Sequence, residues 1–264
     1  MINSIPHLIQ KNKSKFYNKK IIFDENRFIT YQNFAEESIQ VSHYLRKLGY
    51  KKNDRIGIYM SKNINQSLAI CGCLFSGFIF VPILPKLNDA SIKHIIKDCN
   101  MKAIISDQTK ILEIKKYSFL TQIINFKKIF QYINNSKNIK NTKIVLNIKK
   151  NDIASIIYSS GSTGRPKGIV IPHINFVEGA KIVSKYLKTK KNDNIAGVLS
   201  LNFDYGLNQL WQTLLLGCSL FFHELIFAND FFLFLKKRKI SALPLMPVMV
   251  YLIFNGGLSK RFVQ

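Results

Sequence analysis

Residues Tyr158-Ser-Ser-Gly-Ser-Thr-Gly-Arg-Pro-Lys-Gly168 hold the densest group of candidate ligand-binding side chains in this sequence of 264 residues. The hydroxyls come from Ser160, Ser162 and Thr163, the glycines are Gly161, Gly164 and Gly168, and the cations are Arg165 and Lys167. Glycine allows positive φ and a close approach of the backbone to a ligand. Successive backbone N–H groups can then form an anion-binding nest, to which hydroxyls and an ammonium add donors. The stretch therefore predicts a loop that binds a polyphosphate.

The residues on either side of this loop place it between two strands. Residues 153–158 and 168–171 are short apolar runs rich in Ile, which is typical of buried strands. A Walker A loop would instead lead directly into a helix. Pro166 disfavours a helix here, because it lacks an N–H and restricts the residue before it. The position of Pro166 therefore excludes the class of P-loop nucleoside triphosphatases. On composition alone, a Ser- and Gly-rich surface turn that binds nothing remains the alternative.

The first 126 residues alternate between helical and strand patterns. Thr30 is a good N-cap for a helix and Gly49 suits its C-terminal end. The apolar face of this helix consists of Phe34, Val41, Leu45 and Leu48. Further helices are expected at 63–77 and 89–99, and strands at 21–23, 54–60, 78–84 and 102–106. This alternation predicts an α/β fold with largely parallel sheets covered by helices.

A segment rich in Lys and Asn, residues 127–150, interrupts the apolar pattern and is predicted to be a mobile linker. It would separate an N-terminal α/β subdomain, residues 1–126, from a second α/β subdomain, residues 151–264, which carries the loop. In the second part, helices are expected at 173–187, 207–217, 229–237 and 247–254, and strands at 195–200, 219–222 and 241–245.

The net charge of +24 is extreme, with 39 Lys and Arg against 15 Asp and Glu. Such a charge commonly indicates a nucleic-acid or membrane-surface partner. The lysines are scattered, however, and lack the interleaved Arg and aromatic residues of an RNA-binding surface. We therefore interpret the charge as compositional bias on solvated faces and expect no specific nucleic-acid site.

The cysteines and the long uncharged runs also have simple interpretations. The cysteines, Cys71, Cys73, Cys99 and Cys218, match no zinc-binding spacing and are expected to be buried and reduced. The uncharged runs 63–85 and 241–258 each contain two prolines, which favours buried α/β elements over transmembrane helices. With no secretory signal evident, we expect a cytoplasmic protein.

The ordered sequence of the loop resembles the phosphate-binding signature of the adenylate-forming, AMP-binding ligases, which include acyl-CoA synthetases, amino-acid adenylation domains, aryl-CoA ligases and luciferases. The stretch Leu74-Phe-Ser-Gly-Phe-Ile-Phe-Val-Pro82 resembles the opening subdomain of the same family. Residues 203–210, Phe-Asp-Tyr-Gly-Leu-Asn-Gln-Leu, are similar to a branch of acyl-CoA ligase-like proteins found with exopolysaccharide and exosortase systems. The resemblance covers about the first half of a typical member and implies an incomplete N-terminal domain.

The resemblance implies roles for individual residues. The phosphates of ATP would be held by Ser159, Ser160, Gly161, Ser162, Thr163, Gly164, Lys167 and Gly168, with Thr163 and Lys167 acting catalytically. Asp204, together with Phe203, would lie beside the substrate, where adenylation domains place an Asp against a substrate ammonium. His173 would lie near the nucleotide. From the residues themselves, Asp204 could equally cap the helix that follows it, and His173 could cap a helix or lie on the surface.

The implied activity is ligation with release of AMP. Such enzymes use ATP and Mg²⁺ to convert a carboxylic acid into an acyl-adenylate, and pass the acyl group to the thiol of CoA or of a carrier protein's phosphopantetheine. The sequence shows no aromatic-Gly-x-Thr-Glu stretch, no later ribose-binding Asp and no C-terminal domain with a catalytic Lys. We therefore expect little ligase activity from this chain alone.

Three classes of function remain open at this point. The chain could be one part of a split ligase that a second polypeptide completes. It could instead be a non-catalytic remnant that binds a nucleotide or an acyl group. A basic scaffold for nucleic acid or an anionic membrane is the third class.

Overall fold

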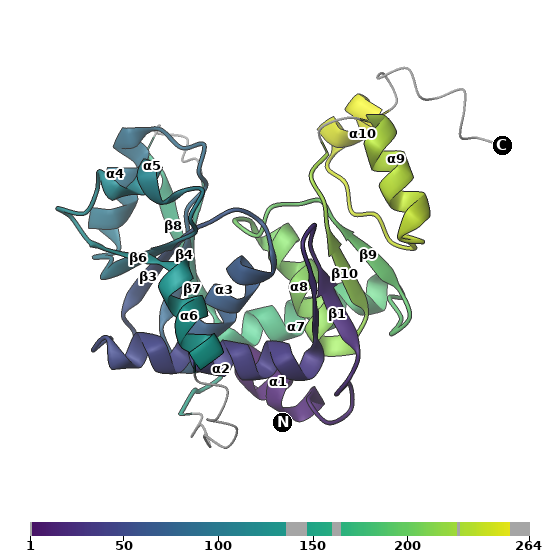
Figure 1. The fold of residues 1–264 in the computed structure, drawn as a ribbon, viewed down its shortest axis with the longest axis horizontal. Coiled ribbons are helices and arrows are strands. Elements are labelled where there is room, and N and C mark those ends of the chain that lie inside the picture. The colour runs from purple at the N-terminus through teal and green to yellow at the C-terminus, as the bar shows by residue number, and fades with distance from the viewer. Residues whose placement is uncertain (1, 136–146, 160–164, 226–227, 254–264) are drawn as a thin grey trace.

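The computed structural model describes residues 2–135, 147–159, 165–225 and 228–253 (Figure 1). The helices in these residues are α1 (Ile5–Asn12), α2 (Tyr31–Lys47), α3 (Ile64–Ser76), α4 (Asp89–Asp98), α5 (Ile111–Lys115), α6 (Phe126–Asn135), α7 (His173–Tyr186), α8 (Asp204–Leu216), α9 (Ala228–Lys237) and α10 (Pro247–Ile253). The strands are β1 (Lys20–Phe23), β2 (Phe28–Thr30), β3 (Arg55–Tyr59), β4 (Ile79–Pro82), β5 (Ala103–Ser106), β6 (Gln122–Asn125), β7 (Ile153–Ser159), β8 (Lys167–Pro172), β9 (Asn194–Gly197) and β10 (Ser219–Phe222).

Within the described residues the strands form two sheets. The larger sheet has the order β6-β5-β3-β4-β7-β8, and the smaller has the order β2-β1-β10-β9. All neighbours are parallel except β7 with β8 and β1 with β2. The predicted α/β class with largely parallel sheets is confirmed.

Helices cover both faces of the larger sheet, as a parallel sheet requires, and α8 packs against the smaller sheet. Figure 1 shows α4 and α5 on one side of the larger sheet, α9 and α10 beyond the smaller sheet, and α3, α7 and α8 between the two. Phe176 of α7 links the two sides of this central layer, because its ring lies 5.9 Å from that of Phe80 in β4 and 5.1 Å from that of Trp211 in α8. Both sheets therefore share one helical core.

Local signals account for the limits of the central helices. Thr30 caps α2, and its hydroxyl accepts a hydrogen bond from the Asn33 amide at 3.3 Å. Asn63 caps α3 in the same way, accepting from the Gln66 amide at 3.0 Å. Gly77 ends α3 with φ of 70°, a left-handed conformation that glycine adopts without strain. The prediction that Leu48 lies on the buried face of α2 is wrong: it is the C-cap and is 41% exposed.

The hydrogen-bonded sheets do not follow the division expected at residues 127–150. Strand β1, from the first part of the chain, lies beside β10, and β7, from the second part, lies beside β4. Residues 126–135, most of which were assigned to the linker, form α6, with Phe126, Ile129 and Ile133 buried. Residues 136–146 lie outside the described residues. The composition of a segment does not show which strands pair across it.

One predicted strand is not formed in the described residues, whereas the predicted state of the cysteines is confirmed. Residues 241–245 were predicted to form a strand but make only an isolated parallel bridge between Ala242 and Ile195. The cysteines are buried and free, as expected. Among the described residues, no helix is both long enough and apolar enough to cross a membrane.

Candidate functional site

The predicted loop does join two paired strands. Strands β7 and β8 run antiparallel, from Ile153 opposite Pro172 to Ser159 opposite Lys167, with a register shift between Ile153 and Ser155. Ser159 and Lys167 therefore face each other at the end of the hairpin where the loop connects the two strands. Both residues are exposed. The other candidate phosphate ligands, Ser160, Gly161, Ser162, Thr163 and Gly164, lie outside the described residues.

The hairpin places the loop at the carboxyl edge of the larger sheet. Strand β7 is parallel to β4, which is parallel to β3, and β3 is parallel to β5. The loop thus follows the same ends of the strands as Ser61 after β3 and Asp107 after β5. Open α/β sheets bind ligands outside the carboxyl ends of their strands. The position of the loop agrees with that rule.

Helix α4 contacts the hairpin on both sides of the loop. His94 Nε2 lies 3.0 Å from the carbonyl oxygen of Pro166, just before β8. The hydroxyl of Tyr158, at the end of β7, donates to the carboxylate of Asp98. Burial, followed by this hydrogen bond, raises the pKa of Tyr158 well above its ordinary value, so the phenol stays protonated and remains a donor. The two contacts fix both chain segments that lead to the loop.

Gly168 has a packing role that can be stated from the described residues. It lies in β8 opposite Tyr158. A Cβ atom at this position would lie 2.8 Å from Cγ2 of Ile156 and 3.1 Å from Cζ of Tyr158. Close packing against β7 is therefore sufficient to require glycine here.

The Phe203-Asp204 pair lies beyond the end of β9, where α8 begins. Phe203 is the N-cap of α8 and makes no side-chain capping bond, and Asp204 is the first helical residue. Asp204 Oδ1 accepts a hydrogen bond from the adjacent Tyr205 amide at 2.8 Å. The interpretation of Asp204 as the N-cap is therefore wrong, although a carboxylate in the first turn still complements the helix dipole. Phe203, Asp204 and Tyr205 are all exposed.

His173 is neither on the surface nor a side-chain cap, contrary to both structural alternatives. It is fully buried as the first residue of α7, and its backbone amide donates to the Asp152 carbonyl at 3.0 Å. Burial lowers the pKa of its ring to about 4. Pro172 pairs with Ile153 at the end of the hairpin opposite Lys167. The backbone at His173 is thus about six strand residues, or roughly 20 Å, from Lys167, so His173 lies at the opposite end of β8 from this candidate phosphate ligand.

Sequence reasoning missed one glycine that shapes the Asp204 region. A Cβ atom on Gly206 would lie only 2.0 Å from the carbonyl oxygen of Ser200. Helix α8 can therefore approach the turn after β9 only with glycine at this position. The glycine itself can be seen in the sequence, two residues after Asp204. The Ser200 carbonyl that it approaches could not be inferred.

The described residues contain no group of three or more His, Cys, Asp or Glu side chains that could hold a metal ion.

The chain matches the family model described as "AMP-binding enzyme" over residues 9–263. It is 26% identical over 250 residues to gramicidin S synthase 1 of Brevibacillus brevis, a match covering 94% of this chain and 22% of that protein. Tyrocidine synthase 1 of Brevibacillus parabrevis is 24% identical over 247 residues, with 92% and 22% covered. The chain thus spans less than a quarter of these relatives.

Solved structures share the fold. The complex of VinN with L-aspartate superposes with a TM-score of 0.87 at 20% identity, covering 94% of this chain and 63% of VinN. The N-terminal subdomain of Klebsiella oxytoca NpsA in complex with 3-hydroxybenzoyl-AMSN gives a TM-score of 0.82 at 17% identity, with 97% and 63% covered. With the family match over nearly its whole length, the chain belongs to the AMP-binding enzyme family.

Proposed function

We propose that this chain provides the ATP-binding part of a ligase that activates a carboxylic acid as an acyl-adenylate. The proposal depends on one combination of observations. The family match spans residues 9–263, and the β7–β8 hairpin presents the exposed Lys167 and Ser159 on facing strands at the carboxyl edge of the larger sheet.

The donors around the loop suit a polyphosphate. Lys167 and Arg165 are exposed cations that can approach phosphate oxygens. We assign phosphate binding to Ser159, Ser160, Ser162, Thr163 and Lys167, with the loop glycines allowing the backbone to approach. Lys167 and Thr163 would stabilise the charge that develops as pyrophosphate leaves. ATP, bound with Mg²⁺, supplies AMP as the activating group of the acid.

The acid substrate is proposed to bind beside Asp204. Asp204 is exposed, as are Phe203 and Tyr205, which precede and follow it in the sequence beyond the carboxyl end of β9. A carboxylate flanked by aromatic rings can bind an ammonium group by charge and by cation–π attraction. This favours an amino acid, the class of ligand in the VinN complex, over the aryl acid class of the NpsA complex.

The acceptor is proposed to be a thiol, on either CoA or the phosphopantetheine of a carrier protein. The relatives named as peptide synthases favour a carrier protein as partner. Since the chain spans 63% of VinN, the rest of an active ligase would come from further residues or from a separate chain. We place the reaction in the cytoplasm, where ATP and CoA are available.

The experiment is calorimetric titration of Mg²⁺–ATP into the wild-type chain and the Lys167→Ala variant. Lys185→Ala, which removes an exposed lysine from α7, is the matched control. Wild type and control should bind ATP, and Lys167→Ala should bind about 10- to 100-fold more weakly, as for loss of a charge-assisted hydrogen bond. Equal binding by all three proteins would contradict the assignment of Lys167.

Pyrophosphate release with a panel of amino acids, fatty acids and aryl acids tests the second half of the proposal. Release that depends on an amino acid and is lost in Asp204→Asn would support the substrate assignment. ATP binding that is retained without any release would leave the loop assignment intact and would identify the chain as the nucleotide-binding part alone.

A further inference from the structure

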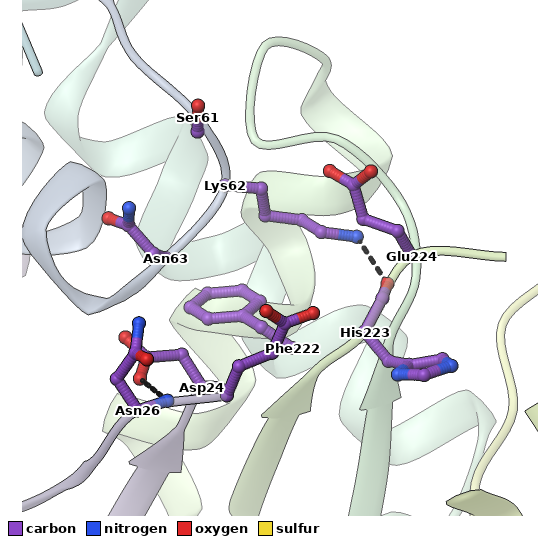
Figure 2. Close-up of a pocket in the computed structure, with 9 residues that line it drawn as sticks. Asp24, Asn26, Ser61, Lys62, Asn63, Phe222, His223 and Glu224 are labelled. Atoms are coloured by element: carbon purple, nitrogen blue, oxygen red, sulfur yellow. Dashed lines mark hydrogen bonds between the residues drawn. The ribbon is translucent and has the colours of Figure 1, made fainter. Parts of the chain in front are cut away.

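A cavity of about 250 Å³ lies where the ends of three strands meet. Asp24 and Glu25 follow β1, Lys62 follows β3, and His223 and Glu224 follow β10 (Figure 2). Strands β1 and β10 are parallel neighbours in the smaller sheet, and β3 belongs to the larger sheet. The cavity therefore combines carboxyl ends of strands from both sheets, which is the usual place for a ligand in an α/β fold.

Lys62 extends into this cavity from the larger sheet. Its ammonium donates to the backbone carbonyl of His223 at 2.8 Å, as Figure 2 shows. An ammonium has three donors, so this bond uses one of them and the others can serve a ligand. Burial lowers the pKa of Lys62 to about 8, which Glu224 partly opposes, so the group is still mainly protonated at neutral pH. An oxyanion in the cavity would accept the hydrogen bonds that this ammonium can no longer give to water.

The carboxylates of the cavity differ in how far they are already engaged. Asp24 accepts hydrogen bonds from the amides of Asn26, Arg27 and Ile64, so its role is to shape the turn after β1 and the start of α3. Glu25 and Glu224, in contrast, are exposed residues. The cavity thus has a half-buried cation and two exposed carboxylates.

This distribution of charge selects among classes of ligand. A simple anion would meet Lys62 but would be repelled by the two glutamates. A simple cation would be attracted by the glutamates but would face the half-buried ammonium. A molecule with an acidic group at one end and an amine at the other matches both. The volume lies just below the roughly 300–1,000 Å³ of sites for drug-sized ligands, so the ligand is a small metabolite.

We propose that this cavity binds a small zwitterion, with its carboxylate on Lys62 and its ammonium toward Glu25 and Glu224. Phe222 provides the apolar contact along the ligand, and His223 meets the cavity with the backbone carbonyl that binds Lys62. The ring of His223 is itself held by stacking on Phe234, with ring centroids 4.1 Å apart and an interplanar angle of 6°. None of the residues that line this cavity is one to which we assign ATP or acid binding, so the inference does not depend on the proposed function.

The test uses three probes of matched length, namely 4-aminobutyrate, butyrate and butylamine, titrated into the full chain by calorimetry. We expect 4-aminobutyrate to bind and the two singly charged probes to bind at least about tenfold more weakly. Lys62→Met should weaken 4-aminobutyrate binding about 10- to 100-fold, and Glu224→Gln about two- to fivefold, as for an exposed ion pair. Lys185→Met is the matched control and should bind as the wild type does.

Three outcomes would overturn the proposal: equal binding of the three probes, unchanged binding in Lys62→Met, or no binding of 4-aminobutyrate at all. The last outcome would leave Lys62 as a purely structural link between the sheets. If Lys62→Met does not fold, the comparison of probes on the wild type and on Glu224→Gln still decides. Binding of 4-aminobutyrate should also be unchanged in Lys167→Ala, which separates this site from the ATP loop.

Discussion

His94 Nε2 lies 3.0 Å from the carbonyl oxygen of Pro166, so α4 holds the chain where the loop returns to β8. A carbonyl oxygen can only accept a hydrogen bond, so His94 must carry a proton on Nε2. Asp98, four residues further along the same face of α4, accepts from Tyr158 at the other side of the loop. One helical face therefore positions both ends of the proposed phosphate-binding segment.

His94→Ala should weaken ATP binding while leaving the fold intact. The lost hydrogen bond contributes about 0.5–1.5 kcal/mol, which corresponds to a two- to tenfold loss of affinity. His94→Gln, which can restore a donor, should recover part of it. Lys93→Ala, which alters the exposed neighbour, should bind ATP as the wild type does in the same calorimetric titration. Equal affinities for Lys93→Ala and His94→Ala would argue against a positioning role for His94.

Gly206→Ala and Gly179→Ala should have opposite effects on stability. The added Cβ at position 206 would lie 2.0 Å from a backbone oxygen, which cannot move aside as a side chain can. We expect a loss of about 1–3 kcal/mol in the free energy of unfolding. At position 179 in α7 the nearest atom would be 3.6 Å away, and alanine should stabilise the helix by roughly 0.5–1 kcal/mol. Urea denaturation of both variants checks this, and equal changes would refute the close approach.

Stability should fall as the pH decreases from about 6.5 to 4 because of His173. Burial lowers its pKa from 6.5 to about 4, so the unfolded chain binds a proton in this range that the folded chain does not. Asp152 opposes the shift, whereas His7 and Lys52 add to it. The total effect is on the order of 3 kcal/mol, at about 1.4 kcal/mol for each pKa unit.

The check on this prediction is the pH dependence of unfolding in His173→Phe. This variant should lose most of the slope between pH 6.5 and 4. His43→Phe, which alters a half-buried histidine on α2, should keep most of it. An unchanged slope in His173→Phe would show that other groups cause the acid sensitivity.

The predicted elements that the structure confirms have local signals, whereas α1, β2, α5, β6 and α6 were not predicted. The Thr30 and Asn63 caps, Gly49 and Gly77, and the apolar strand runs lie within a few residues of the elements they determine. Strand pairing could not be predicted, because β1 pairs with β10 across nearly 200 residues. The same limit explains the expected strand at 241–245: its apolar pattern was present, but only Ala242 bridges to a neighbour.

The candidate site was predictable to a similar extent. The loop could be recognised from a contiguous stretch, and its place between two strands followed from Pro166 and the flanking runs. His173 could not be placed, because nothing in its neighbourhood in the sequence shows that α7 buries its first residue. The cavity around Lys62 was missed for the same reason. Its residues come from three separate segments that only the parallel arrangement of the strands brings together.

The chain should self-associate through the apolar surface of α10. Met246, Val248 and Tyr251 are 45%, 57% and 66% exposed, and Leu233 on neighbouring α9 is 65% exposed. Grouped apolar side chains of this kind are more often covered by another surface than left in water. We expect the sedimentation coefficient to rise with concentration in analytical ultracentrifugation, and the double variant Val248→Glu, Tyr251→Glu to suppress the rise. Leu112→Glu, which alters an isolated residue of α5 that is 80% exposed, should not. A wild-type chain that sediments as a monomer at high concentration would contradict this prediction, because the apolar side chains would then remain exposed to water without association.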